Sequence, residues 1–249
     1  MLRMLLERVS AHIVLKRRFT RKFGRAAVFV TPGAALRYWR FGLDGADPPL
    51  LRAAQEIVSS GSIVWDIGAN VGLFTFAAAA LAGGKGKVIA VEPDVWLVSL
   101  LRRSASMQPG DHAPVTILPA AITDQVGITT LHVVARSRSS NFVSGGGSPN
   151  RGSPVRSTET TMAVTLDWLA QYLPSPDVLK IDVGGLEAKV LQGGHAVLAK
   201  RPKILCEVYS EHQREVAAML GAYGYRFHDY DDPQFRAVEL PPYSMLALT

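Results

Sequence analysis

Short apolar runs alternate along the chain with segments in which apolar residues recur every three or four positions. A short apolar run predicts a strand buried on both faces, and the wider spacing predicts an amphipathic helix. The order of these segments predicts an α/β fold, a mostly parallel sheet with helices on both faces. Predicted strands cover 63–65, 87–91, 115–118, 178–183, 203–209 and, as an edge strand, 243–248. Predicted helices cover about 48–59, 71–81, 94–107, a stretch from 186 and a stretch ending near 223.

The first 49 residues do not follow this alternation, and they are expected to form an extension before a domain over 50–249. Apolar residues at helical spacing predict a helix over 2–16. The runs 26–31 and 35–40, on either side of Pro32-Gly33, predict a small hairpin.

The segment 135–160 lacks any apolar period. Seven serines, four glycines and two prolines make up half of its 26 residues. Such a composition predicts a flexible insertion. The insertion is either a disordered loop or a mobile cover over a substrate site, and the pattern favours neither.

Composition narrows the class of protein. The 249 residues are 48% hydrophobic and 19% charged, which is typical of a globular protein and excludes wholesale disorder. The longest apolar run, 73–82, is shorter than the roughly 20 residues that span a bilayer. One cysteine, Cys206, excludes an intrachain disulfide, and no secretory signal opens the chain. The expected location is therefore the cytoplasm.

The net charge of +6 is concentrated at the N-terminus. Residues 1–25 contain eight basic residues and one acidic residue, so this segment is +7 and the remainder is −1. A nearly neutral body argues against a nucleic-acid partner. The basic segment is expected to pack on the domain or on another subunit. The alternative is a peripheral contact with the inner membrane surface, because anionic lipids attract clustered cations.

A glycine-containing loop between the first predicted strand and the next helix carries the clearest chemistry. It reads Asp66-Ile67-Gly68-Ala69-Asn70-Val71-Gly72. Its glycines let the backbone approach a ligand closely, and the amides at a helix N-terminus favour a negative group. Glu92 follows Gly72 by twenty residues and ends the next strand, where an acid can accept both hydroxyls of a ribose. These features predict a nucleoside cofactor.

Asp66 distinguishes between nucleoside cofactors. The dinucleotide fingerprint has glycine at its first position, and a carboxylate there would repel a pyrophosphate. An acid suits a ligand with an ammonium group, such as the methionine portion of S-adenosylmethionine. A nicotinamide-dependent oxidoreductase is therefore disfavoured. A tight strand–helix turn in an unrelated α/β protein stays the structural alternative.

A second acidic residue ends the fourth predicted strand. Asp182 precedes a glycine turn and a helix start, at the strand end where open α/β sheets bind ligands. Asp182 could orient a substrate hydroxyl, take its proton or help hold a metal; the alternative is a helix cap. Glu187 falls in the first helical turn, where an acid is stabilising without any further role.

Several motifs occur in an order that resembles the FkbM-type family of S-adenosylmethionine-dependent methyltransferases. They are D-I-G-A-N-V-G at 66–72, V-E-P-D at 91–94, V-T-L-D at 164–167, L-K-I-D-V-x-G-x-E at 179–187 and V-L-Q-G-G at 190–194. The resemblance covers about residues 60–210. It implies a class I methyltransferase (Rossmann-like) fold. It also implies O-methylation of a hydroxyl on a sugar, glycan or polyketide-like small molecule.

The resemblance also implies roles for particular residues. Asp182 would be the polar group beside the reacting methyl. The loop that would hold the cofactor contains Asp66, Gly68, Asn70 and Gly72. The ribose contact would be Glu92, and the adenine-side segment would be 120–122, with Ala121. Whether a divalent metal takes part is left open.

Gly184 departs from the family pattern, which reads D-V-E-G where this chain reads D-V-G-G. A carboxylate that could bind substrate or a metal is therefore missing. Positioning two reactants supplies about 7–11 kcal/mol, whereas a general base supplies roughly 3–5.5 kcal/mol. We expect cofactor binding to persist with impaired turnover. The alternative is a non-catalytic binding protein with a methyltransferase fold.

Overall fold

The computed structural model describes residues 13–34, 37–135, 138–146 and 154–249, with only the backbone of residues 39 and 40. Its centre is an eight-stranded sheet with the order β13-β12-β14-β11-β10-β3-β4-β5. The strands are β3 (Ile63–Ile67), β4 (Lys87–Val91), β5 (Val115–Leu118), β10 (Val178–Ile181), β11 (Lys203–Glu207), β12 (Arg226–Asp229), β13 (Ala237–Val238) and β14 (Ser244–Leu248).

The strand order reverses direction between β3 and β10. From β3 the chain proceeds outward to β4 and β5, and from β10 it proceeds the opposite way to β11, with all five strands parallel. The loop after β3 and the loop after β10 therefore lead to helices on opposite faces of the sheet. A crevice is left between these loops, at the carboxyl ends of the two strands. This confirms the predicted parallel α/β sheet and places the crevice beside the two predicted motifs.

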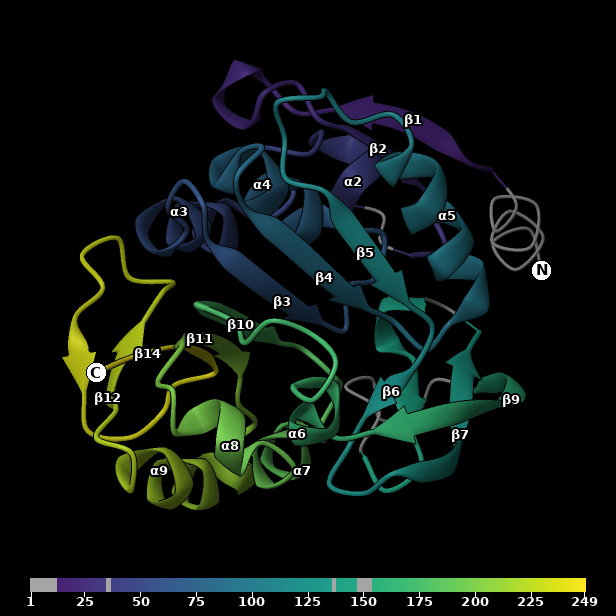
Figure 1. Ribbon diagram of the computed structural model, residues 1–249. Helices are drawn as coiled ribbons and strands as arrows, with labels where there is room; N and C mark the ends of the chain where they lie inside the picture. The colour runs from purple at the N-terminus through teal and green to yellow at the C-terminus, as the bar shows by residue number, and fades with distance from the viewer. Residues whose placement is uncertain (1–12, 35–36, 136–137, 147–153) are drawn as a thin grey trace.

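Helices cover both faces of this sheet (Figure 1). Alternate strand residues pack on opposite faces, so Trp65 joins one core and Val64 the other. Val64 shares its core with residues of α3 (Pro48–Ile57) and α4 (Leu73–Ala82), and α5 (Val95–Ala105) lies on the same side. Trp65 shares its core with residues of α6 (Leu166–Leu169), α7 (Glu187–Gln192), α8 (His195–Leu198) and α9 (Gln213–Gly221). A short turn, η3 (Ser210–His212), precedes α9.

A second, four-stranded sheet stands beside the first and corrects the prediction of a flexible insertion over 135–160. Its order is β6-β9-β7-β8, and β7 pairs with β9 in an antiparallel register. Val155 to Thr160, predicted as loop, belong to β9 because their long-range pairing with β7 outweighs their polar composition. Residues 147–153 lie outside the described chain. The elements here are β6 (Ala121–Ile122), β7 (Gly127–Val134), η2 (Arg138–Ser140), β8 (Phe142–Val143) and β9 (Val155–Val164).

The N-terminal extension differs from its prediction. The strand β1 (Leu15–Arg18) pairs with β2 (Ala27–Val30), across the short turn η1 (Arg21–Phe23). The predicted second arm of the hairpin is instead helical, as α2 (Arg37–Arg40). Side chains of β1 alternate between half-buried and exposed, a period of two that favours a strand over the predicted helix. Most of that predicted helix, residues 2–12, lies outside the described chain.

The extension packs into the body of the molecule. Phe19, Phe23 and Val28 are buried in the same core as Leu97 and Leu101 of α5. Figure 1 shows β1 and β2 beside α5. The predicted boundary at residue 49 therefore does not separate two independent cores.

The last strand is not at an edge, contrary to the prediction. β14 lies between β11 and β12 and runs antiparallel to both. Arg226, His228 and Asp229 interrupt the apolar pattern of β12, so the pattern does not predict this strand and leaves β14 as the apparent edge. Among the described residues, no helix has both the length and the apolar composition to cross a bilayer.

Candidate functional site

Two cavities adjoin where β3 and β10 end. The β11-side cavity has a volume of about 310 Å³ and is lined by residues of β11, α3 and the loop before β14. The β4-side cavity is lined by residues that follow β4 and β5 and by part of the second sheet. Both cavities share the lining residues Gly68, Asn70, Ser139, Asp182 and Gly184. The two predicted motifs therefore meet at the junction of the cavities.

Gly68 brings the loop after β3 against the end of β10. Its φ is +76°, and a Cβ at this position would lie 1.8 Å from the carbonyl oxygen of Asp182. Only glycine permits this approach, because any other residue would collide with the backbone. The loop then continues to Asn70, whose backbone N–H donates to Oε2 of Glu92 at 2.8 Å.

Glu92 faces the β4-side cavity from the end of β4. Its other oxygen, Oε1, accepts a hydrogen bond from the backbone N–H of Asp94 at 2.9 Å. Burial raises the pKa of Glu92 to about 7, although both backbone donors oppose this shift. Each carboxylate oxygen has two lone pairs, so both keep acceptor capacity for further hydroxyl groups. Ala121, on β6, lines the same cavity together with the apolar side chain of Ile122.

Asp66 and Gly72 line neither cavity. The carboxylate of Asp66 is fully buried, and its Oδ1 lies 3.1 Å from Nζ of Lys180. The hydroxyl of Thr75 donates to Oδ2 at 2.5 Å. The ammonium group that Asp66 meets in this structure is thus that of Lys180. Gly72 caps the N-terminus of α4.

Lys180 links both motifs, and it was not among the predicted site residues. Its Nζ donates to the carbonyl of Gly68 at 2.7 Å and lies 3.6 Å from Oδ2 of Asp182. Burial alone would lower the pKa of Lys180, but the carboxylates of Asp66 and Asp182 raise it above its ordinary value. A single lysine inside the apolar strand 178–181 is the sequence feature that could have revealed it.

Asp182 occupies the junction of the cavities, as its place in the sequence predicts. Its side chain is 44% exposed, in contrast to Asp66, which is 0% exposed. Glu187 holds the turn that follows: its Oε1 accepts from the backbone N–H groups of Val183 and Gly185 at 3.3 and 3.0 Å. Asp182 is therefore the acid of this turn that faces the cavities.

Acidic and aromatic side chains line the β11-side cavity. Glu207 ends β11, and the hydroxyl of Tyr243 donates to its Oε2 at 2.5 Å. Burial, reinforced by the charge of Asp182, raises the pKa of Glu207 to about 7. The prediction missed Glu207 because the predicted strand ran on to residue 209. Further lining residues include Arg37, Tyr38, Asp47, Tyr209 and Tyr230.

The segment 138–141 forms part of the walls of both cavities. Arg138 forms an ion pair with Oδ2 of Asp94, and Nδ2 of Asn141 donates to the same oxygen at 2.8 Å. Ser139 lines both cavities. This part of the predicted insertion therefore lines the cavities, and a mobile cover over a substrate site stays a prediction.

The sequence does not decide whether the protein holds a metal ion. Across the part of the chain that the structure describes, no three His, Cys, Asp or Glu side chains are grouped to hold a metal ion.

Comparison with known proteins relates this geometry to a family. A family model described as Methyltransferase FkbM domain matches residues 66–227. A similar curated protein is the hexuronic acid methyltransferase AglP of Haloferax volcanii. It is 27% identical over 194 residues, which cover 75% of this chain and 72% of that protein.

Two solved structures illustrate the likeness in shape. One is the methyltransferase FkbM from Methylobacillus flagellatus KT, with a TM-score of 0.48 and 14% identity, covering 76% of this chain and 43% of that chain. The chain thus spans less than half the length of that protein. Another is Aeropyrum pernix fibrillarin with natively bound S-adenosyl-L-methionine, with a TM-score of 0.46 and 12% identity, covering 95% of this chain and 99% of that chain.

The matched region 66–227 is well over half of the chain, and it carries the loops that follow β3, β4, β10 and β11. These loops contribute lining residues to the two cavities. The chain belongs to the methyltransferase FkbM domain family, and its sheet has the class I methyltransferase fold.

Proposed function

We propose that this chain transfers a methyl group from S-adenosyl-L-methionine to a hydroxyl oxygen of a sugar, a glycan or a polyketide-like metabolite. The observation that carries the proposal is the junction of the two cavities at Asp182 and Gly184. A donor in the β4-side cavity and an acceptor in the β11-side cavity would meet there.

The β4-side cavity suits the cofactor by the chemistry of its lining. Glu92 retains acceptor capacity for ribose hydroxyls, and Ala121 and Ile122 offer an apolar surface for an adenine ring. Gly68 and Asn70 lie at the junction, where the methionine portion would extend. When bound, S-adenosyl-L-methionine supplies an electrophilic methyl group on a sulfonium.

The β11-side cavity suits a hydroxyl-bearing acceptor. Carboxylates such as Asp182 and Glu207 accept hydrogen bonds from hydroxyls, and tyrosine rings cover the C–H faces of a sugar. Asp182 would orient the acceptor oxygen toward the methyl group, a contribution of position. The similarity to a protein named as a hexuronic acid methyltransferase favours a sugar acceptor.

The first test is calorimetric titration with S-adenosyl-L-methionine and with S-adenosyl-L-homocysteine. Release of S-adenosyl-L-homocysteine is then measured with methyl glucoside, methyl glucuronide and methyl glucosaminide as acceptors. Asp182→Asn should lower kcat/KM about 10–100-fold with an unchanged cofactor Kd, because positioning is lost and the cofactor contacts persist. Asp124→Asn, outside both cavities, is the matched control. A protein that binds neither S-adenosyl-L-methionine nor S-adenosyl-L-homocysteine would contradict the proposal.

A second candidate is a non-catalytic binding protein with the same fold. Gly184 favours it, because this residue lines both cavities where the resembling family has a carboxylate. Cofactor binding without turnover of any acceptor, even with glutamate at position 184, would select this candidate.

A further inference from the structure

Two acidic residues occupy equivalent places on neighbouring strands. Ile181 and Cys206 are register partners on β10 and β11, so the next residues, Asp182 and Glu207, follow side by side. Both line the β11-side cavity. The proposed transfer assigns Asp182 to orientation of the acceptor and does not say which group takes the hydroxyl proton.

We propose that Glu207 is the catalytic residue that takes the proton of the acceptor hydroxyl, and that Tyr243 is its positioning residue. This inference rests on the proposed methyl transfer. The hydroxyl of Tyr243 donates to Oε2 of Glu207, and the ring of Tyr243 lies edge-on to Tyr209 with centroids 5.6 Å apart. The carboxylate is thus held from one side at the wall of the cavity.

The neighbouring cation separates the roles of the two acids. Nζ of Lys180 lies 3.6 Å from Oδ2 of Asp182, so Asp182 is engaged in an ion pair. Glu207 has no ion pair with any described residue and is bound through a neutral hydroxyl. Glu207 is therefore the one of the two acids that is not engaged in an ion pair, and it takes the proton.

The charges around Glu207 support a base that works near neutral pH. Burial and the negative charge of Asp182 raise its pKa to about 7, which matches the working range of a general base. Tyr243 and Lys180 oppose this shift, and Asp47 reinforces it. The titratable groups that line the same cavity as Glu207 are Arg37, Tyr38, Asp47, Lys180, Asp182, Cys206, Tyr209, Tyr230 and Tyr243.

The chemical step is balanced. The acceptor oxygen forms a bond to the methyl carbon, and the carbon–sulfur bond breaks, with its electron pair left on the sulfur of the thioether product. The hydroxyl proton passes to a carboxylate oxygen of Glu207 and then to solvent. No oxidant, reductant or metal is needed for this balance.

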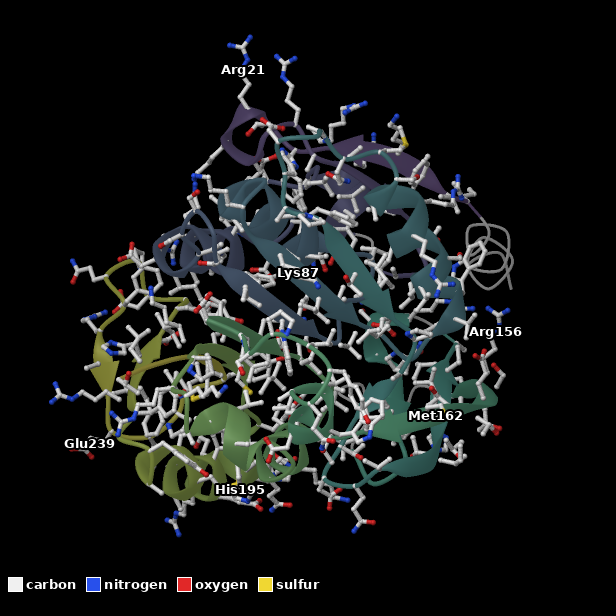
Figure 2. All side chains as sticks on the ribbon, in the orientation of Figure 1. Arg21, Lys87, Arg156, Met162, His195 and Glu239 are labelled. Carbon is white, nitrogen blue, oxygen red and sulfur yellow. The ribbon has the colours of Figure 1, made fainter. Side chains whose placement is uncertain are left out.

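The kinetic test uses the full chain and the release of S-adenosyl-L-homocysteine with the three methyl glycosides, between about pH 5.5 and 9. Glu207→Gln should lower kcat about 10²–10⁴-fold, with KM and cofactor Kd changed less than about threefold, and should remove the acidic limb of the profile. Glu239→Gln is the matched control, since Glu239 lies at the surface (Figure 2). An equal kcat in Glu207→Gln and wild type, or loss of the acidic limb in Asp182→Asn alone, would overturn the inference.

Tyr243→Phe tests the positioning role. Without the donated hydrogen bond the charged form of Glu207 is less stable, so the acidic limb should move to higher pH and kcat should fall about tenfold near pH 7. Tyr172→Phe is the control, because Tyr172 is 68% exposed. An acidic limb at the wild-type pH would exclude this role for Tyr243.

A measurement without acceptor separates this inference from the proposed function. Infrared difference spectra of wild type against Glu207→Gln isolate the carboxyl band of Glu207 during a pH titration. A midpoint near pH 7 supports the inference, and a midpoint below about pH 5 overturns it, even where no acceptor turns over. Failure of the proposed function would instead appear as a wild-type protein that binds no S-adenosyl-L-methionine.

Discussion

Glu92 and Glu207 are glutamates at the carboxyl ends of parallel strands, and burial raises the pKa of each to about 7. A folded-state pKa above the unfolded value means that the folded chain binds the proton more tightly. These carboxyls therefore favour the folded state at acidic pH, and that contribution is lost as the pH rises from about 4.5 to 7. Both groups change charge within the physiological range.

For Glu92 this titration predicts a pH-dependent cofactor affinity. Ribose hydroxyls donate to the ionised carboxylate, so binding should strengthen as the pH rises through about 7. We expect the Kd for S-adenosyl-L-methionine to fall about tenfold between pH 6 and 8, measured by calorimetry. In Glu92→Gln the Kd should be higher than that of the wild type at pH 8, and it should be nearly independent of pH. An equal pH dependence in both proteins would exclude Glu92 as its source.

Gly184 combines an unusual backbone with a place at the junction. Its φ is +67°, and a residue with a Cβ is strained there by about 1–2 kcal/mol. Gly184→Glu should therefore lower Tm by a few degrees and still raise turnover, because it supplies the carboxylate that the resembling family has. Gly184→Ala has the same strain without the charge and should lower Tm alone. Unchanged turnover in Gly184→Glu would contradict the expectation of impaired catalysis.

At the scale of elements, a buried ion pair joins the two central strands. Lys180 and Asp66 are register partners on β10 and β3, and their side chains are 3.1 Å apart. Lys180 also binds the carbonyl of Gly68, so it fixes the loop after β3. The pair therefore couples the stability of the sheet to the shape of the site.

Removal of this lysine should be costly. Lys180→Met leaves Asp66 charged and buried, which lowers the free energy of unfolding by roughly 3–5 kcal/mol. The double variant Asp66→Asn/Lys180→Met should recover most of that loss, because no charge is left unpaired. Urea unfolding measures both, with Lys87→Met at the start of β4 as the control (Figure 2). Equal stability of the single and double variants would show that the pairing contributes little.

The segment 138–141 couples the second sheet to the cofactor side. Arg138→Gln removes the ion pair with Asp94 and should weaken S-adenosyl-L-methionine binding about 5–30-fold through faster dissociation, as followed by stopped-flow fluorescence. Arg156→Gln, at the surface on β9 in Figure 2, should leave dissociation unchanged. The same dissociation rate in all three proteins would show that the segment does not retain the cofactor.

For the whole molecule, the N-terminal extension completes the core instead of standing apart. Phe19 and Phe23 are buried against α4 and α5, while Lys16 and Arg18 are exposed. Arg21 points away from the body in Figure 2. Lys22 and Arg25 are exposed as well. Peripheral contact with an anionic membrane surface stays a proposal, and these exposed cations would take part in it.

Ligand binding should stabilise the molecule as a unit, because both cavities lie at the carboxyl ends of the central strands and the β4-side cavity is also lined by the second sheet. At a concentration of 100 Kd, S-adenosyl-L-methionine adds about 2.7 kcal/mol, or roughly 5–11 °C in Tm for a chain of this size. Differential scanning fluorimetry measures the shift, with NADH as the comparison. A larger shift with NADH would favour a nicotinamide-dependent protein instead.

The sequence by itself determined the parallel α/β core and several residues of the site. Strand ends, glycine turns and helix starts are local patterns. Of the residues chosen from spacing and family resemblance, five line the cavities (Gly68, Asn70, Glu92, Ala121 and Asp182), whereas Asp66 and Gly72 do not. These features are readable because short-range spacing alone specifies them.

Only the tertiary structure decided which charged groups meet. The carboxylate of Asp66 pairs with Lys180, which is 114 positions away in the chain. The carboxylate of Glu207 accepts a hydrogen bond from Tyr243, which is 36 positions away. The β7–β9 sheet likewise formed from a polar stretch through long-range pairing. Burial and pairing across such separations depend on the assembled fold. They set the pKa of Glu92 and of Glu207, which no local pattern of residues specifies.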